Sequence, residues 1–173
     1  RRGAVVTGID FSSEAIATAR ELAAELAIPS RFIESNIYAA PDALHEKFDI
    51  AYTGYGALCW LPDLERWAEI IAHFLRPGGT LYIVESHPIT ELIDESVTDR
   101  VALTGRYFGT GPIRCESPNT YTDSETPLQE RVSYSWAHPL SEIVNSVISA
   151  GLRIEWLHES RLGYFRLHPL AEK

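Results

Sequence analysis

A regular alternation of short apolar runs and helix-like stretches is the feature that most constrains the fold of this chain. Residues 4–9 are β-branched and almost all apolar, which is typical of a strand buried on both faces of a parallel sheet. Apolar residues then recur at helical spacing over 15–26, behind a capping Ser12 or Ser13, and Pro29 closes the stretch. Because parallel strands need such crossovers, the pattern indicates an α/β fold.

The same alternation continues along the chain. Further strands are predicted at 31–35, 48–53, 80–86, 131–136 and 153–159. Helices are predicted at 64–75, ended by the Pro-Gly-Gly at 77–79, and after Pro139. The second of these helices should turn its apolar residues inward, namely Leu140, Ile143, Val144, Val147 and Ile148.

The stretch 87–129 breaks this rhythm, because it is rich in Pro, Thr, Ser and Gly, and it is predicted to hold one helix near 90–103. We therefore predict one α/β domain over 1–173, built on a doubly wound, mostly parallel sheet. Residues 87–129 are expected to be an insertion over the carboxyl edge of that sheet, acting as a lid that orders when substrate binds.

Composition excludes several classes of function. The chain has 173 residues, 45% of them apolar, and a net charge of -9, so it is expected to be a globular protein that does not bind nucleic acid. No run approaches the roughly 18 apolar residues of a membrane span, so no membrane partner and a cytoplasmic location are expected. Cys59 and Cys115 form no C-x-x-C pair, and none of the six His belongs to an H-E-x-x-H motif, so no metal is expected.

Two residue types are scarce. The chain has no Met, and we expect it to be N-terminally incomplete, with roughly 40 to 60 preceding residues that supply a first strand and a glycine-rich loop. Its only lysines are Lys47 and Lys173, which excludes a phosphate-loop G-K-[ST] motif and a Tyr-x-x-x-Lys pair.

Ligands of open α/β sheets bind beyond the carboxyl ends of the strands, so the residues that follow each strand are the candidates for binding. Asp10 offers a carboxylate where the ribose diol of a nucleotide would lie, although an acid here can instead cap the next helix. Asn36 can accept from an adenine amino group, or it is an ordinary turn residue. Thr53 to Gly56 and Glu85 to His87 follow the next two strands.

Four segments in this order, VVTGIDFS, RFIESNIY, FDIAYTGYGALCWLPD and LRPGGTLYIVES, resemble the later motifs of class I S-adenosylmethionine-dependent methyltransferases. The resemblance covers residues 1 to about 87, and AGLRIEWLHE near the end is similar to the same family. It implies S-adenosylmethionine as cofactor and a Rossmann-like methyltransferase fold. In that arrangement Asp10 holds the ribose and Phe11 packs on adenine. Asn36 and Ile37 edge the adenine, and Thr53 with Gly54 lies near the methionine portion.

The chain departs from the family pattern in two ways. The glycine-rich loop that lets the backbone approach the cofactor is absent. Thr53 stands where the metal-dependent branch has a carboxylate, which again argues against a metal.

The resemblance implies transfer of a methyl group to a small molecule by in-line displacement, which needs alignment more than a catalytic residue. If the acceptor is a hydroxyl, His87 and His138 are the candidate bases, although a His before Pro is also a plausible cap or hinge. Aromatic residues are expected to rim the crevice and bind a flat or apolar substrate, chiefly Tyr55, Trp60, Tyr107 and Trp136, with Phe108, Tyr121 and Tyr134 nearby. Trp60 and Trp136 can instead pack the insertion onto the sheet.

Two alternatives stay open. A nicotinamide-dependent oxidoreductase shares an acid after a strand, although the LRPGG segment argues against it. A non-catalytic scaffold that kept the fold and lost the cofactor is the other. The sequence does not predict an oligomeric state.

Overall fold

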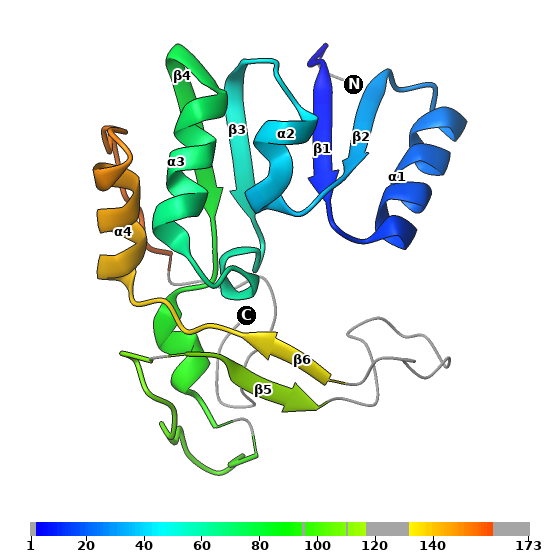
Figure 1. Ribbon diagram of the computed structural model, residues 1–173. Coiled ribbons are helices and arrows are strands. Elements are labelled where there is room, and N and C mark those ends of the chain that lie inside the picture. The colour runs from blue at the N-terminus through cyan, green and yellow to red at the C-terminus, as the bar shows by residue number, and fades with distance from the viewer. Residues whose placement is uncertain (1–2, 95, 110, 117–131, 161–173) are drawn as a thin grey trace. The chain divides into compact units, whose positions relative to one another are not determined.

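The computed structural model describes residues 3–94, 96–109, 111–116 and 132–160 (Figure 1). The chain divides into two compact units, which are described separately. Unit 1 consists of Arg1–Ala51 and Arg66–Thr80, and unit 2 consists of Tyr52–Glu65 and Leu81–Lys173.

Unit 1 begins with a parallel strand pair joined by a helix. β1 (Val6–Asp10) pairs in parallel with β2 (Ser30–Glu34), and Asp10 lies opposite Glu34 in the register. The connecting helix α1 (Ser13–Glu25) starts after Ser12, whose Oγ accepts a hydrogen bond from the Ala15 N–H at 3.2 Å. This cap selects one of the two predicted serines, and the parallel strand–helix–strand unit confirms the predicted α/β pattern.

A small apolar cluster forms the core of unit 1. η1 (Ile37–Ala39) and α2 (Ala40–Ala43) follow β2 and form a short helical stretch where the sequence predicted no helix or strand. The cluster joins Ala40 and Leu44 to Ile70 and Phe74 of α3 (Leu64–Phe74), where the apolar positions predicted at helical spacing face inward. Its partly buried neighbours are Ile9, Ile33, Ile37, Tyr38 and Phe48.

β3 (Phe48–Gly54) and β4 (Leu75–Val84) form a second strand pair, and the division between the units falls within both strands. β4 begins directly after α3, so the predicted Pro-Gly-Gly turn at 77–79 is part of a strand. The approach to β3 explains this difference, because a Cβ added at Gly79 would lie 3.1 Å from the Phe48 carbonyl oxygen. A glycine is therefore needed where the two backbones come close.

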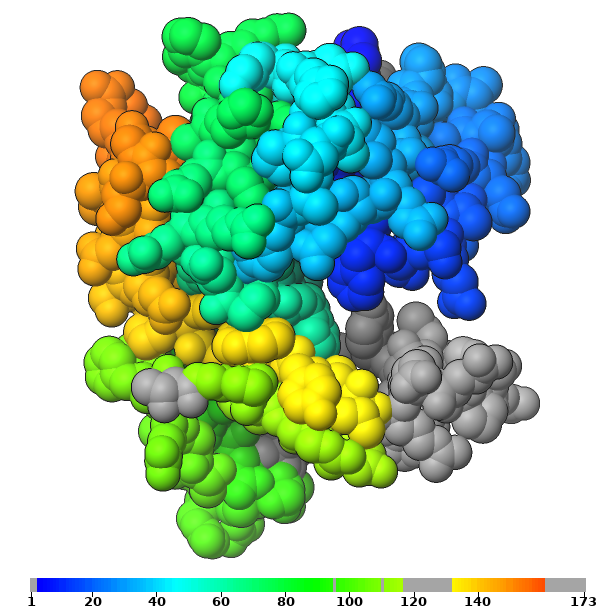
Figure 2. All heavy atoms as spheres, in the orientation of Figure 1, coloured from blue at the N-terminus to red at the C-terminus, as the bar shows by residue number. Residues whose placement is uncertain are grey.

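Unit 2 contains an antiparallel strand pair. β5 (Ile113–Glu116) pairs with β6 (Val132–Ser135), with Ile113 opposite Ser135. Figure 2 shows side chains of both strands at the molecular surface, and β5 is exposed throughout. β6 matches the strand predicted at 131–136, but its partner is a strand inside 87–129 that the sequence analysis did not predict. The remaining elements of unit 2 are η2 (Leu58–Trp60), η3 (Pro88–Leu92) and α4 (Leu140–Ser149).

Two predicted elements are wrong. The helix near 90–103 is replaced by η3 and an antiparallel bridge between Ile93 and Leu103. The Thr104 N–H donates to the Leu92 carbonyl, so the segment closes on itself through this bridge and not through helical bonds. Residues 153–159 belong to no strand and are exposed. They have strand-like alternation, but no ladder partner occurs in the described part of the chain.

Two predictions of burial are also wrong. The 4–9 strand was expected to be buried on both faces, yet Val5 is 91% exposed and Val6 is exposed as well. The pairing of β1 in the described residues is with β2 alone, which covers one edge. In α4 Val147 is buried as predicted, whereas Ile148 is 53% exposed because it follows Val147 by about 100° around the helix.

No helix in the described ranges has the length and apolar character that crossing a bilayer requires.

Candidate functional site

The end of β1 presents an acid beside an exposed aromatic ring. The Asp10 Oδ1 accepts from the Ser12 N–H at 2.8 Å, a local turn contact. Its Oδ2 has no hydrogen bond with a described residue, and the side chain is exposed. Phe11 follows with 76% of its surface exposed. One carboxylate oxygen and one ring face are thus open to a ligand in unit 1.

Asn36 lies close to the same strand end. The Ser35 N–H donates to the Asp10 carbonyl at 2.8 Å, which ties the residue before Asn36 to the end of β1. The Asn36 Oδ1 accepts from the Tyr38 N–H at 2.9 Å and caps η1, and Ile37 is the first residue of η1. The turn role offered as an alternative for Asn36 is therefore present. The amide oxygen already holds one donor, so its NH₂ group is the freer hydrogen-bonding end.

The end of β3 turns sharply in unit 2. Thr53 and Gly54 close the strand, and the Tyr55 N–H donates to the Val84 carbonyl at 2.7 Å. A Cβ on Gly54 would lie 2.8 Å from that same carbonyl, so only glycine fits. Tyr55 has a φ of 61° and Gly56 a φ of 87°, and both are left-handed. A non-glycine residue in this region is uncommon and marks a backbone that its surroundings constrain.

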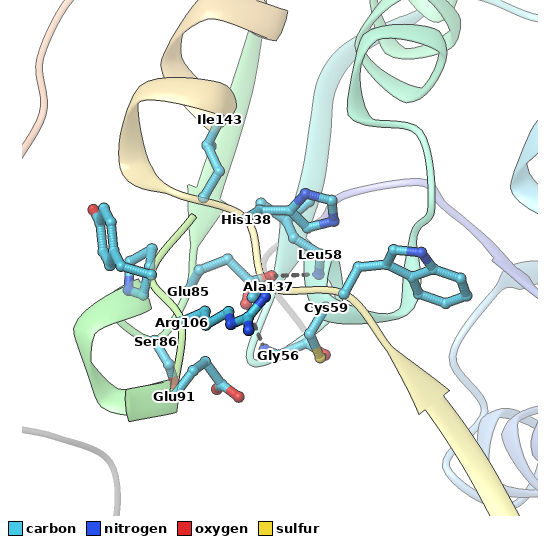
Figure 3. A pocket seen from close by; sticks show the side chains of 13 residues that line it. Gly56, Leu58, Cys59, Glu85, Ser86, Glu91, Arg106, Ala137, His138 and Ile143 are labelled. Carbon is cyan, nitrogen blue, oxygen red and sulfur yellow. Dashed lines mark hydrogen bonds between the residues drawn. The ribbon is translucent and has the colours of Figure 1, made fainter. Parts of the chain in front are cut away.

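Glu85, directly after β4, holds this turn. Its Oε2 accepts from the Gly56 N–H at 2.7 Å, and its Oε1 accepts from the N–H groups of Ala57 at 3.0 Å and Leu58 at 3.3 Å. Figure 3 shows the bonds to Gly56 and Leu58. Glu85 was expected at a strand end, and its sequence context predicted no role for it. Its position after a strand was the available signal, while its bonding partners lie 27 to 29 residues upstream.

A pocket of about 70 Å³ adjoins this turn within unit 2 (Figure 3). Two of the predicted substrate aromatics, Tyr107 and Trp136, line it, whereas Tyr55 and Trp60 are not among its lining residues. The backbone N–H of Trp136 donates to the Cys59 carbonyl at 2.8 Å. This bond fixes the start of the segment after β6 against η2. The rest of the lining combines apolar and charged groups: Gly56, Leu58, Cys59, Glu85, Ser86, Pro88, Glu91, Arg106, Ala137, His138 and Ile143.

The Cys59 thiol faces a negative environment. Burial, together with the carboxylates of Glu91 and Glu85, raises the pKa of Cys59 to about 11. The thiol donates to the Gly56 carbonyl at 3.2 Å. Cys59 is therefore a protonated thiol near neutral pH and a poor nucleophile.

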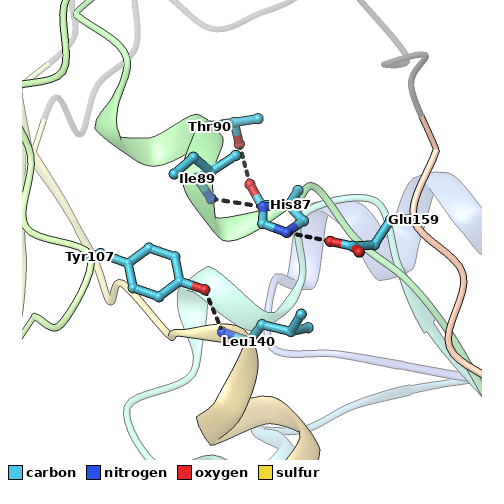
Figure 4. A network of polar contacts seen from close by, with 6 residues as sticks. All are labelled: His87, Ile89, Thr90, Tyr107, Leu140 and Glu159. Carbon is cyan, nitrogen blue, oxygen red and sulfur yellow. Dashed lines mark hydrogen bonds and ion pairs between the residues drawn. The ribbon is translucent and has the colours of Figure 1, made fainter.

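The ring nitrogens of His87 are both engaged (Figure 4). Its Nδ1 accepts from the Ile89 N–H at 3.1 Å and caps η3, and its Nε2 lies 2.7 Å from the Glu159 carboxylate. The cap that the sequence analysis offered as an alternative is present, and a base role would require the cap or the ion pair to open. In the same view the Tyr107 hydroxyl accepts from the Leu140 N–H at 3.2 Å.

His138 is 8% exposed and is also engaged at both nitrogens. Its Nε2 donates to the Leu61 carbonyl at 2.7 Å, and its Nδ1 lies 3.1 Å from the Glu142 carboxylate. The ring lines the pocket yet links η2 to the first turn of α4. Neither histidine presents a free nitrogen to a substrate, so catalysis by either stays a prediction.

No group of three or more His, Cys, Asp or Glu side chains that could hold a metal ion occurs among the residues that the structure describes.

The first part of the chain is similar to a known protein family. Residues 1–79 match a family described as a methyltransferase domain. No curated protein matches the chain.

Solved structures extend the likeness. A S-adenosylmethionine-dependent methyltransferase from Clostridium acetobutylicum ATCC 824 is similar with a TM-score of 0.58 and 12% identity, over 85% of this chain and 63% of that one. Streptomyces venezuelae DesVI is similar with a TM-score of 0.60 and 17% identity, over 87% of this chain and 67% of that one. The present chain thus spans about two thirds of the length of these proteins. The predicted resemblance is confirmed by the match of residues 1–79 to a methyltransferase domain. The predicted fold class is confirmed as well, because the fold is the Rossmann-like fold of these solved methyltransferases.

Proposed function

We propose that this protein transfers a methyl group from S-adenosylmethionine to a small-molecule acceptor. The observation that carries the proposal is the end of β1, where an Asp10 oxygen and the Phe11 ring are both open within the matched methyltransferase domain. A carboxylate that can accept from a diol, beside an exposed flat ring, suits the ribose and adenine of a nucleoside.

The chain's own residues divide the binding of the cofactor. Asp10 accepts from the ribose hydroxyls and Phe11 packs on the adenine ring. Asn36 and Ile37 edge the adenine, with the Asn36 NH₂ group donating, since its oxygen already caps η1. Thr53 and Gly54 lie near the methionine portion. When bound, S-adenosylmethionine supplies a methyl group already activated by its sulfonium.

The protein then has to align the acceptor and exclude water, which lowers the barrier without a covalent step on the chain. The pocket lined by Gly56, Tyr107 and Trp136 is the proposed acceptor site, because it begins two residues after Gly54 in the same unit. Its aromatic walls suit a flat or apolar molecule.

Several finer points belong to the same proposal and rest on the sequence. Tyr55 and Trp60 are proposed to contact the acceptor from outside the pocket lining, and His87 or His138 is proposed to take a proton only if the acceptor is a hydroxyl. A cytoplasmic location, the lid role of 87–129 and the exclusion of nucleic acid are proposed on composition and charge. Tyr121 and residues 117–129 lie outside the described residues.

Calorimetric titration of the full-length protein with S-adenosylhomocysteine, and separately with NAD, tests the function. We expect S-adenosylhomocysteine to bind and NAD not to bind. Binding of NAD alone would establish the oxidoreductase alternative, and binding of neither ligand would favour a scaffold without cofactor.

A further inference from the structure

The turn after β3 forms an anion-binding concavity out of its own backbone. Gly56 is left-handed with a φ of 87°, and Ala57 is right-handed with φ -84° and ψ -37°. A left-handed residue followed by a right-handed one makes successive N–H groups converge on one point. The N–H groups of Gly56, Ala57 and Leu58 converge in this way, and we call the three residues the 56–58 nest.

The nest is filled by a carboxylate of the protein itself. Glu85 uses both of its oxygens there, one for Gly56 and the other for Ala57 and Leu58. The contact is half-buried, which strengthens hydrogen bonds between N–H donors and a charged acceptor. Three converging donors without an acceptor would leave backbone groups poorly satisfied, so the turn and the carboxylate depend on each other.

We infer that Glu85 is a positioning residue that holds the 56–58 nest in the shape that forms one wall of the pocket. Gly56 and Leu58 of the nest, and Cys59 next to it, all line that pocket. The functional part of this inference, that the wall contacts the methyl acceptor, rests on the proposed function. The structural part does not.

Glu85 also restricts which groups of the pocket can bind a ligand. Because Glu85 already occupies the three N–H donors, they are not available to a carboxylate of cofactor or acceptor. The charged side chains that remain along the pocket wall are Glu91 and Arg106. Arg106 lines the pocket and forms no hydrogen bond or ion pair with any residue that the structure describes, so its guanidinium can meet an anionic group of a ligand.

Chemical rescue in the full-length protein tests the inference. Glu85→Ala leaves an empty nest of the right size for a small carboxylate, so sodium acetate should replace the missing group. We expect amide hydrogen exchange at 56–58 to speed up by about tenfold or more, the change equivalent to about 1.4 kcal/mol. Acetate should restore the slow exchange, and sodium chloride at the same ionic strength should not.

Two further variants keep the test decisive. Glu85→Gln retains the volume but replaces one acceptor oxygen with a donor, so it should speed exchange at 56–58 without rescue by acetate. Glu91→Gln removes the other carboxylate of the pocket, which contacts no N–H of the nest in the described bonds, and should leave exchange at 56–58 unchanged. If Glu85→Ala does not fold, the difference in amide exchange at 56–58 between Glu85→Gln and Glu91→Gln still tests whether Glu85 holds the nest.

Unchanged exchange in the Glu85 variants would overturn the inference. So would faster exchange throughout unit 2 that ignores acetate, because Glu85 would then stabilise the unit without holding this turn. Titration of the wild type with S-adenosylhomocysteine runs in parallel. If that ligand fails to bind while acetate rescues the nest, the proposed function falls and the positioning role of Glu85 stands.

Discussion

Two strand ends in this protein are held in different ways. At the end of β1 the Asp10 carboxylate accepts from an N–H two residues later in the chain, and one of its oxygens stays open. At the end of β3 the turn is held by Glu85, whose partners lie 27 to 29 residues away and use both oxygens. A local contact leaves a side chain available to a ligand, whereas the long-range contact commits it to the fold.

This difference separates two kinds of acidic residue that look alike in the sequence. Both Asp10 and Glu85 stand at the end of an apolar strand, where ligands of α/β sheets bind. Asp10 is expected to affect ligand binding and Glu85 to affect the shape of the site. The following experiments test or sharpen that contrast.

The largest effect is expected from Asp10→Ala in the full-length protein. Loss of charge-assisted hydrogen bonds to the ribose should weaken S-adenosylhomocysteine binding by roughly 10- to 150-fold, with little change in melting temperature. Calorimetric titration beside a thermal melt measures both. Glu34→Ala is the matched control, because Glu34 is exposed and lies opposite Asp10 in the β1–β2 register.

The two roles of Asp10 predict opposite results. If it only caps the turn before α1, the melting temperature should fall and the dissociation constant should stay the same.

The next effect concerns the two cysteines. The pKa of Cys59 is raised from 9.0 to about 11, so at pH 8 its thiolate fraction should be about 100-fold below that of an ordinary cysteine. Alkylation by iodoacetamide, followed peptide by peptide, should label the exposed Cys115 first. The rate at Cys59 should keep rising with pH well beyond 9.

Glu91→Gln tests the direction in which the nearby carboxylate shifts the pKa of Cys59. Removing a nearby negative charge stabilises the thiolate, so the alkylation profile of Cys59 should move to lower pH. A profile of Cys59 that levels off near pH 9 in the wild type would contradict the negative environment described for the pocket.

The two histidines also differ in whether their contacts are long-range or local, and the expected effects on stability are smaller. His138→Ala removes a buried contact to the Leu61 carbonyl, 77 residues away, and should lower the free energy of unfolding by about 1 to 3 kcal/mol. His87→Ala removes a local cap of a short helix and should cost at most about 1 kcal/mol. Urea unfolding of both variants measures the difference.

Catalysis by either histidine predicts another pattern. A general base would lower kcat and change its pH profile by more than the loss of stability explains. An unchanged kcat for His87→Ala would leave the cap as its role.

The smallest effect is expected from an ion pair whose residues lie far apart in the sequence but are both exposed. Arg31 and Glu46 form an ion pair at 2.6 Å across 15 residues, but their side chains are 53% and 57% exposed. Glu46→Gln should change the free energy of unfolding much less than His138→Ala does, and the change should shrink at high salt. A loss as large as that of His138→Ala would show that distance along the chain matters more than burial.

Much of unit 1 followed from the sequence. The order of β1, α1 and β2 and the position of α3 were predicted, because hydrophobic periodicity and a serine cap act over a few residues. The residue types at the strand ends also predicted a resemblance to methyltransferases, which the match over 1–79 confirms.

Unit 2 was less predictable for the same physical reason. The β5–β6 pair depends on hydrogen bonds between residues about twenty apart, and an extended stretch such as 153–159 is a strand only if a partner backbone lies beside it. No local sequence pattern predicts whether such a partner strand lies beside it in the folded protein.

By itself the sequence determined the α/β class, the resemblance to methyltransferases over residues 1–79 and the acid at the end of β1, since all of these depend on periodicity and on residues close together in the chain. Only the tertiary structure decided that Glu85 fills the 56–58 nest, that Tyr107 and Trp136 but not Tyr55 or Trp60 line the pocket, and that both histidines are engaged. Those outcomes depend on which backbone donors and acceptors meet after folding, and the pairing of groups dozens of residues apart is set by packing and hydrogen-bond satisfaction in three dimensions.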